Sequence, residues 1–484
     1  MRPYAAADIG TWDLTADVVI AGYGVAGAAA AVEAARAGAE VLVLERAGGW
    51  GGAAALAGGF VYLGGGTALQ RACGFEDSPE AMAAFLMAAM GPGADAAKVT
   101  DYCEGSVAHF DWLVGCGVPF NPVFYGDPAW EPAGDEGLMY SGGENAAPFD
   151  EIAAPAPRGH LPRMENKRTG ERGGGYMLMK PLVDTAERLG VKAHYGMRIE
   201  RLVVERDGTV RGVVARSYGE RVTVRARRGV VLATGSFTYN DEMLAAHAPL
   251  LSGRPGAAVE EHDGIAVKLA QALGAGVAHM DACEVALPMD PQYSIRGILV
   301  NGRGQRFVNE DTYPGRLGHA ALFQQDNQAF LVLDEEGFEE AGRVSAAPEF
   351  MRMRPAWVCE TAAELGAAMG LPPGALESTL DVYNRHAEDG RDPLLRKAAR
   401  WVRPLRGPLG AVDLRGMTSG FALGGLTTSA DAEVLHVDGA PVPGLYAAGR
   451  ATAGIAAWGY ASGISLGDGS FYGRRAGGAA ARNR

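Results

Sequence analysis

The chain has 484 residues, of which 48% are hydrophobic and 21% charged, which is the composition of a globular protein. This length is too great for one hydrophobic core, so we expect two or three domains. A formal net charge of −13 argues against nucleic acid or an anionic membrane surface as a partner.

Three further features of the composition bear on location and on metal binding. The longest apolar stretch, Val18 to Val32, is broken by glycine and too short to cross a bilayer, so we expect no integral membrane contact. Residues 1–8 contain no apolar signal region, which predicts a cytoplasmic protein. The five cysteines show no CxxC pair and no metal-ligand spacing, so we expect buried free thiols and no metal site.

The first predicted unit is a β-α-β segment over residues 17–45. Its strand runs into a turn with three glycines. Gly22 makes the tight turn, Gly24 lets backbone amides approach a pyrophosphate, and Gly27 lets the helix pack closely on the strand. Glu45 ends the second strand, where a carboxylate can accept a ribose hydroxyl. The segment predicts a dinucleotide site and leaves the choice between NAD and FAD open.

The middle of the chain predicts loops and helices before a run of strands. We expect a glycine-rich loop pressed against a flat ligand at 48–66, then helices over 78–114 that are broken by Gly91-Pro92-Gly93. Long ordered loops over a ligand site follow at 119–175, and then a helix from Tyr176 to Gly190. Strands over 191–235, with turns at Asp207-Gly208 and Ser217–Glu220, precede a helix after Gly264. A disordered linker is the alternative for 119–175, but aromatic residues are too frequent there. From 281 to 410 the β-α-β rhythm is lost, which favours an inserted domain.

The C-terminal segment decides between the two dinucleotides. Gly444-Leu-Tyr-Ala-Ala-Gly449-Arg450 is typical of a last strand that reaches the flavin, and Val230 to Gly235 of a strand that re-enters beneath FAD. A helix that begins near Ser465 would aim its positive end at the pyrimidine edge of the flavin. A nicotinamide enzyme completes its site within one contiguous domain, so we expect FAD, and a nicotinamide dehydrogenase stays the alternative.

The expected fold class is α/β, with a Rossmann-like FAD-binding domain that has a three-layer ββα core. Residues 1–280 and 411–484 form this domain, and residues 281–410 form an inserted α+β catalytic or capping domain. The residues expected at the FAD site are Gly22, Gly24, Ala26, Gly27, Glu45, Arg46, Gly52, Ala53, Ala54, Gly58, Gly59, Met197, Ala233, Thr234, Gly235, Gly449, Arg450, Ser465 and Leu466.

Several motifs resemble the fumarate reductase/3-ketosteroid dehydrogenase superfamily of flavoproteins over essentially the whole chain. Besides the glycine turn and the 48–66 loop, they are Asn301-Gly-Arg-Gly-Gln-Arg-Phe-Val-Asn-Glu310, Leu423-Gly-Gly-Leu426 and the C-terminal glycine-rich run. Within the superfamily the chain is most similar to the 3-ketosteroid Δ4-(5α)-dehydrogenases. The segments that carry this likeness are Glu310-Asp-Thr-Tyr313-Pro-Gly-Arg, Gly459-Tyr460-Ala-Ser462-Gly463 and Ser465 to Arg475.

The fumarate reductase branch of the superfamily binds both carboxylates of its substrate with arginines and histidines, because burying unpaired charges is costly. The corresponding positions here hold Tyr313-Pro314, Tyr460 and Gly420-Phe421. The resemblance therefore implies a neutral, hydrophobic ketone as substrate, with a steroid as the leading candidate. The histidine that carries covalent flavin in succinate dehydrogenases has no counterpart in Ala53 to Ala57, which implies non-covalent FAD.

The resemblance implies Tyr313, Tyr460 and Ser462 as the catalytic group. A base takes the proton from carbon 4 while hydride leaves carbon 5 for the flavin, in a trans elimination. We expect Tyr460 to lie nearest the proton, with Tyr313 and Ser462 as a hydroxyl relay to solvent; the first acceptor stays open.

Other polar and aromatic residues of these motifs have simpler interpretations. His262 and His319 are expected to be structural, and Arg303 and Arg306 to solvate a surface turn. Trp458 either walls the substrate pocket or packs the flavin domain.

The predicted function is therefore an FAD-dependent dehydrogenase that places a double bond between carbons 4 and 5 of a 3-ketosteroid. The alternatives are Δ1-type or other desaturation, or ene reduction, of another hydrophobic ketone. A fumarate reductase-like enzyme and a non-catalytic flavoprotein are weaker candidates. The electron acceptor, the direction of the reaction and the oligomeric state stay open.

Overall fold

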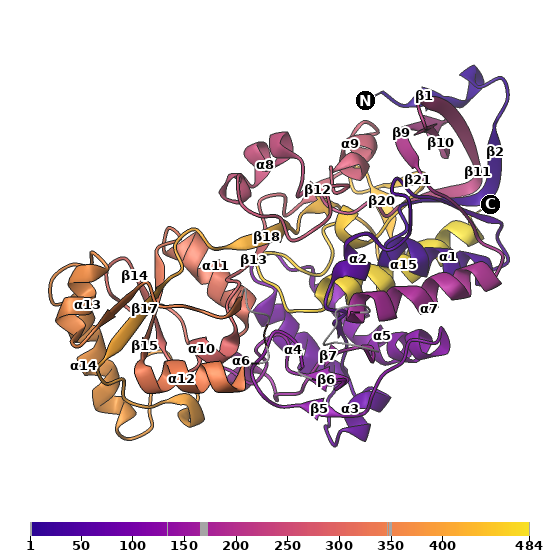
Figure 1. Ribbon diagram of the computed structural model, residues 1–484. Helices are drawn as coiled ribbons and strands as arrows, with labels where there is room; N and C mark the ends of the chain where they lie inside the picture. The colour runs from indigo at the N-terminus through magenta and orange to yellow at the C-terminus, as the bar shows by residue number, and fades with distance from the viewer. Residues whose placement is uncertain (1, 133, 165–172, 346, 348–350, 484) are drawn as a thin grey trace.

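A nine-stranded sheet forms the framework of the protein in the computed structural model, which describes residues 2–132, 134–164, 173–345, 347 and 351–483 (Figure 1). Its central strands are parallel, in the order β11 (Glu220–Leu232), β2 (Leu14–Ala21), β3 (Val41–Leu44) and β8 (Lys192–His194). The long β11 pairs on its other side with β10 (Val210–Ser217) near its start and with β21 (Pro441–Ala447) near its end. The remaining strands of the sheet are β1 (Tyr4–Ala5), β9 (Met197–Val204) and β20 (Glu433–Leu435).

Alternation along the central strands produces the three layers that the sequence predicts. Val18 and Ile20 of β2 face a core shared with helices α1 (Val25–Arg36), α7 (Gly174–Arg188) and α15 (Ile464–Arg482). Val19 and Ala21 face the opposite core, which β9 and β10 cover together with α8 (Asp241–His247) and α9 (Ile265–Gln271). Because side chains alternate across a strand, each central strand serves both cores. The α/β fold class with a ββα core is confirmed.

The two ends of the chain meet where α15 packs against α1, the yellow and indigo helices of Figure 1. Glycines on α15 allow this close approach: a Cβ on Gly473 would lie 2.5 Å from the Ala26 carbonyl oxygen, and one on Gly477 would lie 2.1 Å from that of Ala30. The C-terminal helix is therefore held over the glycine turn at the start of the chain.

The segment 48–66 differs from the predicted loop. It contains helix α2 (Gly52–Leu56) and strand β4 (Val61–Tyr62), which pairs with β7 (Gly159–His160). Gly51, with φ of 113°, turns the chain into α2, and the alanines that follow are strong helix formers. The glycines thus punctuate short elements instead of preventing them.

Residues 68–132 and 134–160 form a layer of helices and short strands beside α7. The predicted break at Gly91 to Gly93 is present, since it separates α4 from α5. The described part of 119–175 consists mostly of loops, as predicted; residues 165–172 lie outside the described residues. The elements of this layer are α3 (Ala68–Ala72), α4 (Pro79–Ala89), α5 (Ala96–Gly115), β5 (Phe124–Tyr125), β6 (Leu138–Met139) and α6 (Phe149–Ile152).

Residues 287–345 and 351–414 build a second sheet with a helix layer on each face, at the left of Figure 1. The antiparallel sheet has the order β14 (Ile298–Asn301), β15 (Ala329–Asp334), β17 (Leu409–Asp413) and β16 (Trp357–Cys359). Leu331 and Leu333 of β15 pack toward α10 (Pro291–Ser294), α11 (Pro314–Gln324) and α12 (Glu335–Val344). Phe330 and Val332 pack toward α13 (Ala362–Ala368) and α14 (Ala375–Ala387).

Strand β13 (Cys283–Ala286) leads into this region and pairs with β18 (Ser419–Ala422), which leads out of it. Cys283 and Val285 belong to the core beneath the main sheet. The division at residues 281 and 410 stays a prediction. A further two-stranded sheet joins β12 (Val277–Ala278) and β19 (Gly425–Leu426). The 3-10 helices of the described residues include η1 (Ala6–Asp8), η2 (Pro249–Leu251), η4 (Ala399–Trp401) and η5 (Gly449–Ala451).

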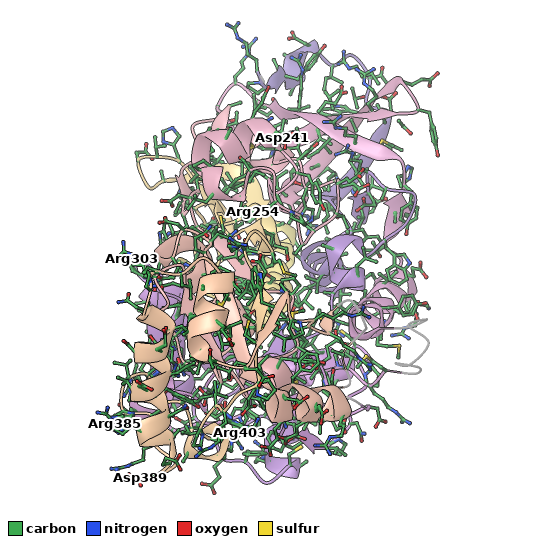
Figure 2. All side chains as sticks on the ribbon, turned by 60° about the vertical axis from the view of Figure 1, so that its left-hand side comes forward. Asp241, Arg254, Arg303, Arg385, Asp389 and Arg403 are labelled. Atoms are coloured by element: carbon green, nitrogen blue, oxygen red, sulfur yellow. The ribbon has the colours of Figure 1, made fainter. Side chains whose placement is uncertain are left out.

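The structure corrects two predictions about side chains outside the cavity. Arg303 is exposed at the edge of the second sheet, as Figure 2 shows, but Arg306 is buried. The Arg306 guanidinium lies 2.7 Å from Glu310 and 2.9 Å from Asp392. It therefore joins the segment after α14, which holds Asp392, to the segment between β14 and α11, which holds Glu310. Among the cysteines, Cys73 and Cys359 are only half-buried.

In the described ranges, no helix is both long and apolar enough to span a bilayer.

Candidate active site

A cavity of about 470 Å³ runs from the carboxyl end of β2 to the loop before α15. All the predicted cofactor residues except Gly27 line it, and so do Tyr313, Tyr460 and Ser462. The chain thus brings together residues from the glycine turn, the 48–66 segment, the end of β11, the second-sheet region and the C-terminal helix. These segments are far apart in the sequence.

The glycine turn has the geometry of a phosphate-binding turn. Gly22 has a φ of 100°, and a Cβ there would lie 2.4 Å from the Ala233 carbonyl oxygen. A Cβ on Gly27 would lie 2.0 Å from the Gly22 carbonyl oxygen, so Gly27 acts by letting α1 pack under the turn. Gly24 precedes the first residue of α1, whose N-terminal amides face the cavity. A helix N-terminus of this kind attracts anions.

Glu45 is held at the end of β3 by two backbone amides. Its Oε2 accepts a hydrogen bond from Tyr23 N at 2.7 Å, and its Oε1 accepts one from Ala47 N at 2.8 Å. Burial raises the pKa of the Glu45 carboxyl, while these amide donors act in the opposite direction. Its neighbour Arg46 lines the cavity with its guanidinium 2.9 Å from Asp263.

The three predicted catalytic hydroxyls lie at the other end of the cavity. Tyr313 is the residue before the first turn of α11, and its hydroxyl donates to Glu284 Oε1 at 2.7 Å. The Tyr460 hydroxyl accepts a hydrogen bond from Ser465 N at 3.0 Å, at the start of α15. Backbone contacts fix Ser462, since its N donates to the Ser141 carbonyl oxygen and its carbonyl accepts from Ser141 Oγ.

Burial dominates the electrostatics of this group. It raises the pKa of Tyr460 to about 12 and places that of Tyr313 well above its usual range. Burial also raises the pKa of Glu284 to about 8, and the hydrogen bond from Tyr313 opposes this shift. A carboxyl with such a pKa exchanges its proton readily near neutral pH.

Sequence reasoning missed Glu284. The signal was an acidic residue between Cys283 and Val285 in an otherwise apolar strand, which is unusual for a structural position. Its strand neighbour β18 explains Gly420, because a Cβ on Gly420 would lie 2.0 Å from the Glu284 carbonyl oxygen. The tight pairing leaves no space for a histidine side chain at that position.

Residues 17–466 match the protein family described as FAD binding domain. The chain belongs to this family.

Named relatives of the FAD-binding chain include steroid dehydrogenases and fumarate reductases. A crystal structure of 3-ketosteroid-Δ4-(5α)-dehydrogenase from Rhodococcus jostii RHA1 in complex with 4-androstene-3,17-dione is 66% identical, covers 100% of both chains and superposes with a TM-score of 0.98. The 3-oxo-5-alpha-steroid 4-dehydrogenase of Comamonas testosteroni is 29% identical over 92% of this chain and 94% of that protein. A fumarate reductase (cytochrome) of Shewanella frigidimarina is 28% identical over 97% of this chain and 77% of that protein.

Buried polar atoms of the cavity fit FAD, the cofactor of this family. Among the described residues, Thr234 Oγ1, Ser465 Oγ and Arg450 Nε are buried without a hydrogen-bond partner. Buried polar groups are rarely left unpaired, so the three atoms suit the ribityl, phosphate and ring oxygens of a flavin. Arg450 is fixed beside the N-terminal half of α15, because its Nη2 lies 3.3 Å from Asp468.

The lining of the cavity is largely apolar. Its apolar side chains include Ala286, Pro288, Met351, Trp130 and Phe421, and the Phe421 ring packs edge-on against Tyr460. The three arginines that line the described part of the cavity, Arg46, Arg198 and Arg450, already lie within ion-pair distance of aspartates. This arrangement offers no spare guanidinium for a dicarboxylate.

Proposed function

We propose that this FAD-dependent oxidoreductase desaturates a 3-ketosteroid between carbons 4 and 5. The observation that carries the proposal is the set of three hydroxyls and one carboxyl at the apolar end of a cavity that fits FAD. The likeness to the Rhodococcus jostii enzyme, described with 4-androstene-3,17-dione, supports the choice of substrate. The largely apolar lining agrees with an uncharged ring system and argues against fumarate.

We propose that the turn from Gly22 to Gly27 and the α1 N-terminus hold the pyrophosphate of FAD, and that Glu45 accepts the adenosine ribose hydroxyls. Arg450 and the α15 N-terminus, with Ser465, would then face the pyrimidine edge of the flavin. Their positive potential favours the negative charge that develops there on reduction. Bound FAD supplies the hydride acceptor. In the absence of a histidine in α2, the binding is non-covalent.

The hydrogen bonds favour Tyr460 as the donor to the substrate ketone. Its oxygen already accepts the Ser465 amide, so its own O–H is free to donate to a ketone oxygen. An amide donor also weakens a phenol oxygen as a proton acceptor. Tyr460 would therefore stabilise the enolate as negative charge develops, in place of the base role that the sequence favoured.

Tyr313 and Ser462 are then the candidates for taking the proton from carbon 4. Tyr313 already directs its proton toward a carboxyl, so its oxygen can accept a new proton while it passes its own on. With FAD bound on the side of the steroid away from the hydroxyls, proton and hydride would leave opposite faces of the steroid, and the elimination would be trans.

We further propose that residues 281–410 act as the substrate domain. Glu284 and Tyr313 come from this segment, whereas Tyr460 and Ser462 come from the C-terminal segment. Trp130 links the loops of 119–164 to the same segment, since its indole N–H donates to the Met289 carbonyl oxygen at 2.7 Å. The site is complete only when these three parts of the chain lie together.

Anaerobic mixing of the FAD-loaded protein with 5α-androstane-3,17-dione tests the proposal. We expect the flavin absorbance to bleach and 4-androstene-3,17-dione to form, with no bleaching by succinate as the control. Recovery of the 1-ene product would instead assign the Δ1-type reaction. A flavin that stays oxidised with every saturated ketosteroid would refute steroid dehydrogenation.

A further inference from the structure

A second cavity, of about 780 Å³, adjoins the proposed active site. Glu284, Tyr313 and Tyr460 line both cavities, so these three side chains form the partition between them. The second cavity is bordered by α11, α6 and the turn at Gly91. Its rim includes Leu394 and Ile152, which are 65% and 49% exposed, so it reaches the protein surface.

Glu284 is placed in this partition by close packing. A Cβ on Gly315 would lie 2.2 Å from Glu284 Oε1, so the glycine in the first turn of α11 provides the space for the carboxyl. Within the described part of the chain, Tyr313 is the one side chain that hydrogen-bonds Glu284. A buried carboxyl without a cationic partner costs stability, which calls for a functional reason.

We propose that Glu284 receives the substrate proton from Tyr313 and releases it into the second cavity. This proposal rests on the proposed dehydrogenation. Glu284 acts through Tyr313, so it is a positioning and relay residue, not a catalytic residue.

The proton balance of this relay is complete. The electron pair of the carbon 4–hydrogen bond becomes the new π bond as carbon 5 gives up a hydride, which bound FAD would accept. The proton from carbon 4 moves to the oxygen of Tyr313, directly or through Ser462, while the phenolic proton of Tyr313 moves to the Glu284 carboxylate. Glu284 then transfers this proton to water in the second cavity and regains its charge.

The titratable groups around Glu284 allow this exchange near neutral pH. Burial raises its pKa to about 8, and Tyr313 from α11 and Tyr460 from the loop before α15 face it. Arg316 and His319 of α11 line the second cavity. Since only the carboxylate can accept a proton, the rate of flavin reduction should rise with pH through about 8.

Glu284→Gln tests the relay, because the amide keeps the size and the acceptor oxygen but takes no proton. We expect FAD and steroid binding to stay within threefold of the original protein. Flavin reduction should slow by about 10²-fold, typical of losing a proton-transfer group, and its rise with pH should disappear. Glu284→Asp should keep the rise with pH at a reduced rate.

A double-mutant cycle with Tyr313→Phe separates a relay from independent effects. Substitutions at two members of one relay have non-additive effects on the rate, so flavin reduction in the double variant should be no slower than in the slower single variant. Glu144→Gln is the matched control, since Glu144 is a buried carboxyl that lines neither cavity. Its pH profile should match that of the original protein.

An unchanged rate and pH profile in Glu284→Gln would overturn the relay, even if the original protein desaturates the steroid. Additive effects in the cycle would also overturn it. If Glu284→Gln does not bind FAD, the test passes to Glu284→Asp. A rate of flavin reduction that no longer rises with pH in Glu284→Asp would overturn the relay. A protein that no ketosteroid reduces would instead refute the proposed function itself.

Discussion

Replacing Tyr460 by phenylalanine removes one hydroxyl and retains the ring. The ring packs edge-on against Phe421, with centroids 5.6 Å apart, so the apolar wall should stay in place. Two interactions are lost: the proposed donation to the ketone and the observed acceptance from Ser465 N. The substitution thus tests whether this phenol stabilises the enolate.

The structure sets the size of both effects. Loss of one donor to a developing oxyanion typically slows a reaction by about 10²–10³-fold, or about 2.7–4 kcal/mol, and we expect flavin reduction to slow by this factor. Loss of the acceptor removes one hydrogen bond from the half-buried Ser465, which costs about 0.5–1.5 kcal/mol of unfolding free energy. FAD binding should be retained, because the other cavity contacts are untouched.

Stopped-flow flavin absorbance under anaerobic conditions measures the rate across pH. Tyr446→Phe is the matched control, since Tyr446 is buried on β21 and does not line the cavity. A reduction rate within threefold of the original would refute the role of Tyr460. If Tyr460→Phe instead removed the pH dependence and Tyr313→Phe kept it, Tyr460 would be the proton acceptor.

Three further predictions concern the cofactor and the buried carboxyl. Glu45→Ala loses two hydrogen bonds from backbone amides and the proposed ribose acceptor, so the Kd for FAD in equilibrium dialysis should rise at least about 10²-fold. The control Glu40→Ala removes only an exposed ion pair with Arg227 and should leave this Kd within threefold. Acid precipitation should release all flavin into the supernatant, and yellow colour retained in the pellet would contradict non-covalent binding. The pKa of Glu284 is about 8 in the folded state, above its value in the unfolded chain, so between these two pKa values the folded state binds one more proton than the unfolded state. The free energy of unfolding should therefore fall as pH rises toward 8, by at most about 1.4 kcal/mol per pH unit. In urea titrations Glu284→Gln should lack this fall, and parallel curves for the two proteins would contradict it.

The sequence by itself determined the local elements of the flavin site. The turn from Gly22 to Gly27 could be predicted because its glycines stand at a fixed spacing within one β-α unit, where Gly27 packs against the Gly22 carbonyl oxygen five residues earlier. The alternating apolar residues of β2 and the turn at Asp207-Gly208 likewise encode their own strands. Such patterns are set by neighbours along the chain, which the sequence displays directly.

Only the tertiary structure decided which distant side chains meet. Glu284 and Tyr313 come together because β13 pairs with β18 and α11 begins beside it, and Gly315 leaves room for the carboxyl. Arg306 was predicted at the surface because its neighbours are typical of a turn, yet Asp392, 86 residues away, pairs with it in the interior. The burial that raises the pKa of Glu284 likewise depends on every element packed around it, so no local pattern specifies it.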